Sequence, residues 1–149
     1  MLIRKVTATF TTTILFSIIL AGWFVKLDGL TPNDGNYLIF WTMTFGSYMG
    51  AIILTYGNLV SFFIEWLQGK WHWINHLVYI LLHGVFGLAN GLLFESWMLG
   101  CEGAAAAIIY ALIDRWVYFR QRKEKGIQWF YILPIVVYLL TWGVLEWAF

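Results

Sequence analysis

The sequence contains few charged residues: Asp, Glu, Lys and Arg make up 11% of its 149 residues, whereas 61% are hydrophobic. Soluble globular proteins carry about 25% charged residues, so this composition excludes a soluble surface. The formal net charge of +1 provides no field that would attract nucleic acid, which excludes that class of partner. We therefore expect the lipid bilayer to be the solvent of this chain.

Cysteine and catalytic motifs are also scarce. The single cysteine, Cys101, has no second cysteine with which to form an intrachain disulfide. The chain has no nucleophile elbow, no metalloprotease motif and no phosphate-binding glycine loop. These absences disfavour an enzyme and predict no cofactor, although a site assembled from separate helices would escape a motif search.

Five apolar stretches are long enough to cross about 30 Å of hydrocarbon, which takes about 20 helical residues. They are Val6–Val25, Tyr37–Ile64, Trp73–Glu95, Gly103–Phe119 and Ile127–Trp147. The loops between them are predicted at Lys26–Asn36, Glu65–His72, Ser96–Glu102 and Arg120–Gly126. None of these loops would fold by itself, so residues 1–149 are expected to form one all-α domain, a polytopic membrane bundle of five transmembrane helices.

The positive charges predict the orientation of these spans. With a cytoplasmic N-terminus, all but Lys26 of the nine Lys and Arg residues face the cytoplasm, as the positive-inside rule favours. The basic run Arg120–Lys125 then acts as a topology anchor, and the C-terminus is external. Glu95, Glu102 and Glu146 gather toward the external end and are interpreted as solvated helix ends.

Polar residues inside the second span share one helix face. Asn58, Ser61 and Glu65 follow one another at spacings of three and four residues, near the predicted cytoplasmic end. On the third span His72, His76, His83 and Asn90 recur at spacings of four and seven residues, again on one face.

Asp114 and Arg115 lie near the cytoplasmic end of the fourth span, at about the depth of Glu65 and His76. A shared interhelical cluster or polar pathway is therefore expected. Its candidate residues are Asn58, Ser61, Glu65, His76, His83, Asn90, Asp114 and Arg115.

Such a cluster has two interpretations, because intramembrane ionisable groups mark ion or proton pathways but also hydrogen-bond neighbouring helices. His83, near the midplane, would be a relay residue or haem ligand in the first case and an interhelical donor in the second. His72 and His76 would supply two metal ligands, but no third ligand follows at a recognisable spacing, so no metal site is predicted.

Glycines mark faces where helices can approach closely in lipid, where packing drives helix association. The candidate helix-packing residues are Gly46, Gly50, Gly57, Gly84, Gly87 and Gly91. The fourth span begins with small residues at 103–107, which would also allow a neighbouring helix to come close. This half of the span is therefore predicted to be buried.

Three segments, Thr55–Trp66, Leu81–Phe94 and Ala107–Trp116, resemble a group of small integral membrane proteins of Bacillus-type bacteria that has no assigned function. The matching features are Tyr56-Gly57, Ser61, His83-Gly84 and Asp114. The first and last spans match only in hydrophobicity. The resemblance implies a multi-pass protein of the bacterial plasma membrane and adds no activity.

Three functions remain open. The first is a structural or interaction component, which forms a homo-oligomer or serves as an accessory or immunity-type subunit of another membrane protein. The second is a small channel or transporter with a pathway through Asn58, Glu65, His76, His83 and Asp114. An intramembrane enzyme or a haem or metal carrier is the least favoured. A coloured purified protein would indicate a cofactor, and ion flux in proteoliposomes would indicate transport.

Overall fold

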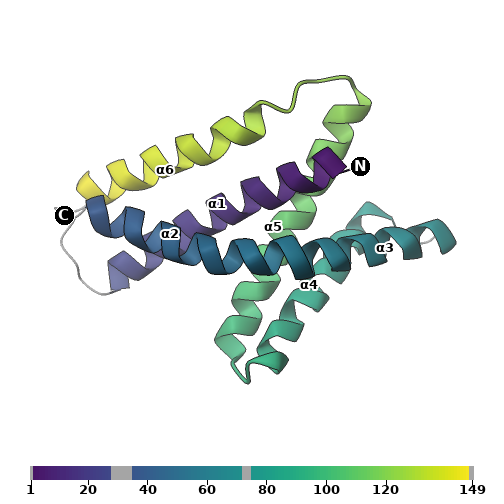
Figure 1. The fold of residues 1–149 in the computed structure, drawn as a ribbon, viewed down its shortest axis with the longest axis horizontal. Coiled ribbons are helices and arrows are strands. Elements are labelled where there is room, and N and C mark those ends of the chain that lie inside the picture. The colour runs from purple at the N-terminus through teal and green to yellow at the C-terminus, as the bar shows by residue number, and fades with distance from the viewer. Residues whose placement is uncertain (1, 28–34, 72–74, 148–149) are drawn as a thin grey trace.

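The computed structural model describes residues 2–27, 35–71 and 75–147, and within these ranges every regular element is a helix (Figure 1). The elements are α1 (Leu2–Leu27), α2 (Gly35–Ile52), the π-helical turn η1 (Ile53–Gly57), α3 (Asn58–Lys70), α4 (His76–Leu93), α5 (Trp97–Arg122) and α6 (Trp129–Trp147). Since α2, η1 and α3 follow one another without a break, they form one long rod. The expected all-α class is confirmed.

Within the described ranges, four helical segments are long and apolar enough to cross a membrane: Leu2–Leu27, Tyr37–Lys70, His76–Leu93 and Trp97–Arg122. A shorter apolar helix, Trp129–Val144, follows them. Each apolar stretch of the sequence thus corresponds to a helix. The number of crossings and their orientation stay predictions.

Two predicted loops are wrong over most of their length. The segment expected at Glu65–His72 is helical as far as Lys70, and Glu65, which accepts a hydrogen bond from Lys5 of α1, lies within that helix. The segment expected at Ser96–Glu102 is helical from Trp97, because the Ser96 side chain caps α5 by accepting a hydrogen bond from the Leu99 amide.

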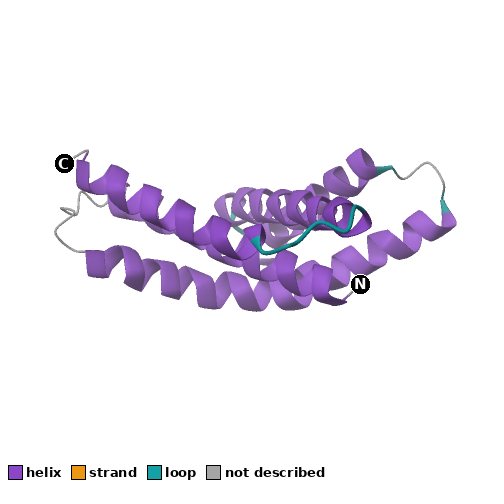
Figure 2. Ribbon diagram, turned by 90° about the horizontal axis from the view of Figure 1, so that it is seen from above, coloured by secondary structure: helices purple, strands orange, loops and turns teal. Residues whose placement is uncertain are grey.

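The helices do not run in one direction. In Figure 1, α1, α2 and α6 lie roughly alongside one another, while the α4–α5 hairpin crosses them at a steep angle. Figure 2 shows that the described connections between helices are short loops. Because α1 packs against α2, α5 and α6, it is the central helix, and side chains from the other helices converge on it.

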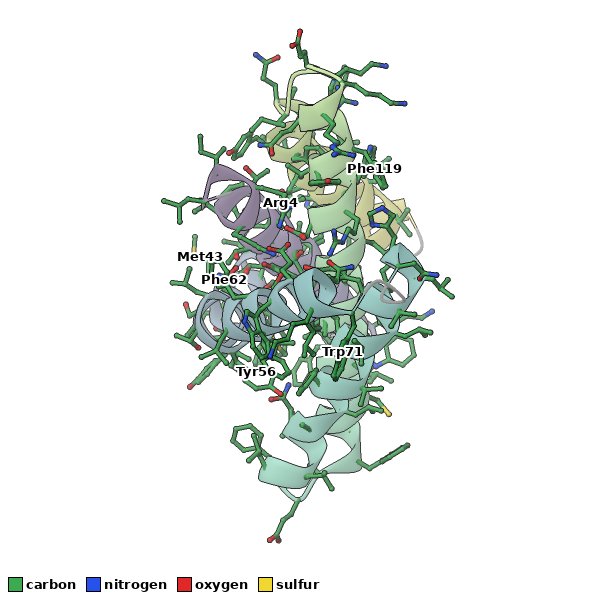
Figure 3. The ribbon with its side chains drawn as sticks, turned by 90° about the vertical axis from the view of Figure 1, so that its right-hand side faces the viewer. Arg4, Met43, Tyr56, Phe62, Trp71 and Phe119 are labelled. Carbon is green, nitrogen blue, oxygen red and sulfur yellow. The ribbon has the colours of Figure 1, made fainter. Side chains whose placement is uncertain are left out.

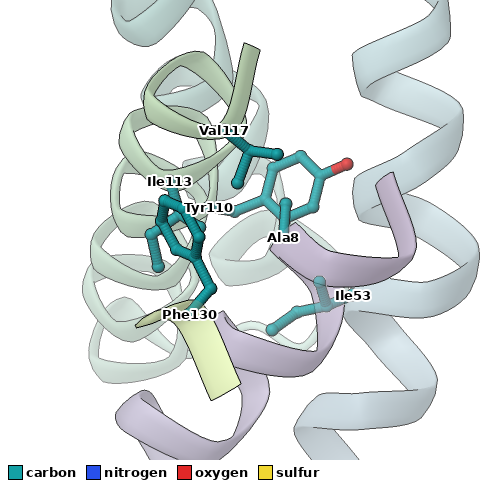
Figure 4. Packing of buried hydrophobic residues seen from close by; sticks show 6 residues of the cluster. All are labelled: Ala8, Ile53, Tyr110, Ile113, Val117 and Phe130. Carbon is teal, nitrogen blue, oxygen red and sulfur yellow. The ribbon is translucent and has the colours of Figure 1, made fainter. Parts of the chain in front are cut away.

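A small apolar core fills the crossing of α1, η1, α5 and α6. Its buried residues are Ala8, Ile53, Tyr110, Ile113, Val117 and Phe130 (Figure 4). Ala8 is completely buried, and its single methyl group allows α5 to come close. Small residues at crossings matter in lipid, where van der Waals packing takes the place of the hydrophobic effect.

Glycines set the distance between α4 and α5. Gly87 lies against the backbone of Gly103, and a Cβ atom on Gly91 would come within 2.8 Å of the Gly100 Cα atom. A Cβ on Gly84 would meet the Ile108 side chain at 3.2 Å. The hairpin is therefore closed by backbone contact that a larger residue would prevent.

The remaining predicted packing glycines behave differently from one another. Gly46 and Gly50 face α1, where a Cβ would meet Ser17 at 3.6 Å and Thr13 at 3.3 Å. For Gly57 the nearest atoms belong to Ile53 of the same rod, so its interpretation as a contact to another helix is wrong. It lies in the π-helical turn instead.

Candidate functional site

Four charged side chains from three helices meet inside the protein: Arg4 and Lys5 from α1, Glu65 from α3 and Asp114 from α5. Arg4 pairs with Glu65, and its Nε lies 3.0 Å from Asp114 Oδ1 in an ion pair that lacks hydrogen-bond alignment. Lys5 Nζ lies 2.9 Å from Glu65 Oε1 and 3.4 Å from Asp114 Oδ2. Two cations thus meet two carboxylates, and we name this set the charge cluster.

Burial makes these pairings obligatory. The Asp114 side chain is 0% exposed and that of Lys5 is 2% exposed. A charge removed from water needs a partner and further hydrogen bonds to offset its lost hydration. Figure 3 shows Arg4 in the interior, close to side-chain oxygens, whereas Met43 points outward.

Two hydroxyl groups complete the charge cluster. Lys5 Nζ donates a hydrogen bond to Ser61 Oγ, and Ser61 Oγ lies 2.5 Å from the Tyr79 hydroxyl. The Tyr79 hydroxyl in turn donates to Asp114 Oδ2 at 2.9 Å. Ser61 and Glu65 reach the same place because they are one turn apart on α3. The result is a continuous hydrogen-bonded chain across four helices.

Arg115 points away from its neighbour Asp114, as expected for adjacent residues on a helix. Its Nη2 donates to Gln68 Oε1 at 2.7 Å, and its guanidinium carbon lies 3.5 Å from the centre of the Tyr79 ring. The side chain is buried, so it does not extend to lipid headgroups. Arg115 therefore lies beside the charge cluster and touches it through the Tyr79 ring.

Asn58 forms a second polar contact between helices. Its Nδ2 donates to Thr9 Oγ1 at 3.1 Å, and its Oδ1 accepts a hydrogen bond from the Tyr110 hydroxyl at 2.8 Å. This contact joins α1, α3 and α5. Asn58 lies on the same face of α3 as Ser61 and Glu65, on the preceding turn.

The structure separates His76 from the two other described polar residues of the third predicted span, His83 and Asn90. His83 is buried on α4, stacked against Tyr110 with ring centres 5.8 Å apart. Asn90 packs against Gly103 in the hairpin. His76 is exposed and touches Phe119 with ring centres 4.9 Å apart, so its expected place in the cluster is wrong. His72 lies outside the described residues.

The sequence pattern does not identify three members of this site, which are Arg4, Lys5 and Tyr79. From the sequence the two cations are expected to be cytoplasmic charges, because a basic residue at the start of an apolar helix usually extends to the headgroups. Tyr79 lies one turn before His83, and this spacing of four was the signal that could have identified it. A tyrosine in an apolar helix is, however, commonly an interfacial or core residue.

An apolar cavity of about 300 Å³ lies between the α2–η1–α3 rod and the α4–α5 hairpin. The aromatic residues of its wall are Phe45, Tyr48, Tyr56, Phe86, Phe94 and Tyr110. The wall also contains His83, Asn90 and Glu102. Glu102, expected as a solvated helix end, is half-buried within α5, which corrects that interpretation.

The π-helical turn η1 borders this cavity, since Ile53, Tyr56 and Gly57 belong to its wall. A π-helical turn inserts an extra residue into the helix and widens it locally, and such turns often occur at functional sites. Among the described residues no three His, Cys, Asp or Glu side chains are placed to hold a metal ion. Because most of its wall is apolar, the cavity is suited to an apolar molecule.

Comparison with known proteins provides no family assignment. The chain matches no family model, no curated protein and no solved structure. The charge cluster and the cavity are therefore the features that bear on its function.

Proposed function

We propose that this chain is a multi-pass protein of the bacterial plasma membrane that acts as an interaction component and has no enzymatic activity. In this proposal it binds another membrane molecule in the cavity between the α2–η1–α3 rod and the α4–α5 hairpin. The charge cluster holds the helices around that cavity. The plasma membrane location rests on the resemblance to Bacillus-type membrane proteins and on the apolar helices.

The pairing within the charge cluster is the observation that carries this proposal. Each cation of the cluster contacts both carboxylates, and Ser61 and Tyr79 take up further hydrogen bonds. Breaking such a buried arrangement to pass an ion would leave charges without partners, at a cost of several kcal/mol. A permanent structural contact between α1, α3, α4 and α5 is the simpler role.

The glycines favour the cavity over helix faces as the binding site. Gly84, Gly87 and Gly91 pack against α5, and Gly46 and Gly50 pack against α1. These faces are occupied within the chain, so they offer no close approach to a second subunit. A homo-oligomer would have to form through other surfaces, and the cavity is the better candidate for binding.

A proton pathway is the second candidate, favoured by one observation. Lys5, Ser61, Tyr79 and Asp114 form a continuous hydrogen-bonded chain, which is the arrangement through which protons move between ionisable groups in membrane proteins. The apolar wall of the neighbouring cavity argues against it, because a pathway needs water on both sides of its relay.

Proton flux separates the two candidates. Purified protein in proteoliposomes, with a pH-sensitive dye inside and a potassium diffusion potential across the bilayer, should leak protons no faster than empty liposomes. Flux above that level that disappears in a folded Asp114→Asn variant would establish the pathway and remove our proposal.

Native mass spectrometry tests the binding role. Protein extracted from membranes in mild detergent should carry a bound membrane molecule. Ala107 belongs to the cavity wall, so the larger side chain of Ala107→Phe would occupy part of the cavity and this variant should lose the bound molecule. Ala105→Phe, on the exposed face of the same helix, should keep it. Equal retention by both variants would place the molecule elsewhere and contradict a role for the cavity.

A further inference from the structure

His83 belongs to the wall of the cavity, and its ring Nε2 has no hydrogen-bond partner among the described residues. Its Nδ1 lies 2.9 Å from the Tyr79 carbonyl oxygen, and a carbonyl oxygen can only accept. Nδ1 therefore carries the hydrogen, which leaves a lone pair on Nε2 of the neutral ring. His83 is 1% exposed, so this acceptor is buried and unsatisfied.

The nearby hydroxyl groups of the wall are already engaged. The Tyr56 hydroxyl donates to the Phe86 carbonyl oxygen at 2.9 Å, and the Tyr110 hydroxyl donates to Asn58 at 2.8 Å. Neither serves His83, although Tyr110 stacks on its ring. The donor that satisfies Nε2 would therefore come from a molecule in the cavity.

The cavity selects for a flat ring. Aromatic side chains from α2, η1, α4 and α5 make up much of its wall, and they favour offset or edge contacts with another ring. A volume of about 300 Å³ is at the lower end of ligand pockets and suits a head of one or two rings. Tyr48 and Phe94 belong to the wall and are also exposed, so a tail attached to the ring has an exit.

We propose that the cavity binds a lipid-soluble phenol or hydroquinone whose hydroxyl group donates a hydrogen bond to His83 Nε2. A phenolic hydroxyl, with a pKa of about 10, is a stronger donor than an aliphatic alcohol. The ring lies among the aromatic side chains, and an apolar tail leaves toward lipid. This inference rests on the proposed function, because it names the class of molecule that the cavity takes.

Two probes, one with a hydroxyl donor and one in which a methyl group replaces the hydroxyl hydrogen, test this assignment. Isothermal titration calorimetry in detergent micelles, with a micelle-only titration subtracted, compares 1-naphthol with 1-methoxynaphthalene. The wild-type protein should bind 1-naphthol about tenfold more tightly, because the methoxy group leaves the buried acceptor unsatisfied. Equal affinities of the two probes would overturn the assignment without requiring any variant.

Two histidine variants test whether the preference for 1-naphthol depends on His83. His83→Phe keeps an aromatic ring but has no acceptor, and it should bind both probes with affinities within about twofold of each other. His76→Phe is the matched control, since His76 is exposed on the same helix outside the cavity wall, and it should keep the wild-type preference. A naphthol preference that persists in His83→Phe would refute the role of His83.

The outcome also separates this inference from the proposed function. If both probes bind with equal affinity and Ala107→Phe abolishes both, the cavity is a binding site and only the hydrogen bond to His83 is refuted. If neither probe binds and the extracted protein carries no membrane molecule, both the inference and the binding role are refuted.

Discussion

Removing the charge of Asp114 should destabilise this protein strongly. The side chain is completely buried and contacts Arg4, Lys5 and the Tyr79 hydroxyl. Asp114→Asn keeps its size but leaves two cations with Glu65 as their single carboxylate. Removing one partner of a buried ion pair costs about 3–5 kcal/mol, and we expect the free energy of unfolding to fall by an amount in this range.

The loss in the free energy of unfolding should depend on the balance of cations and carboxylates in the charge cluster. Lys5→Met alone leaves two carboxylates with one cation and should also be costly. The double variant Lys5→Met/Asp114→Asn returns to one cation, Arg4, and one carboxylate, Glu65, which are in contact in the wild type. It should therefore lose less stability than the sum of the single variants, by about 1–3 kcal/mol.

The assay is unfolding in mixed micelles by titration with sodium dodecyl sulfate, followed by the fluorescence of the 10 Trp residues. Refolding on dilution of the detergent establishes reversibility, and gel filtration checks that each variant starts as the same species. Losses that add to within about 0.5 kcal/mol would refute a coupled charge cluster, because independent sites are additive to that extent.

Three further outcomes follow from the structure. Gly87→Leu should cost about 3 kcal/mol or prevent folding, because its side chain would meet the α5 backbone, whereas Gly143→Leu, with nothing within 4 Å, should be nearly neutral in the same titration. Arg115→Lys should lose about 1 kcal/mol of stability because an ammonium group does not stack on the Tyr79 ring as a guanidinium does. Topology reporters fused within Arg120–Lys125 should read cytoplasmic and those at the C-terminus external; the reverse result at either site would remove the five-span prediction.

The helical class and the approximate helix positions were predictable from the sequence. Apolar runs without charge can lie in lipid only if every backbone group is hydrogen-bonded internally, which a helix achieves by itself. This argument uses one segment at a time and needs no knowledge of its neighbours. The predicted helix ends were less accurate, because they depend on contacts that this argument does not include. Ser96 caps α5, and Glu65 accepts a hydrogen bond from Lys5 of α1.

Only some members of the charge cluster can be identified from the sequence. Ser61, Glu65 and Asp114 stand out because polar residues are costly in an apolar helix. Arg4 and Lys5 do not, because the same residues near a helix end can extend to water at little cost. Which of these two environments they occupy depends on whether α3 and α5 present carboxylates beside α1.

The cavity, finally, was decided by tertiary structure alone. The sequence determines that Gly87 and Gly91 are small and that His83 lies on α4, and these properties hold whatever the helix packs against. A cavity, however, is space that several helices leave between them, and the unsatisfied His83 Nε2 is defined by which donors fail to reach it. Such properties depend on helix crossing angles and distances, which follow from the simultaneous packing of all side chains and are encoded in no single segment.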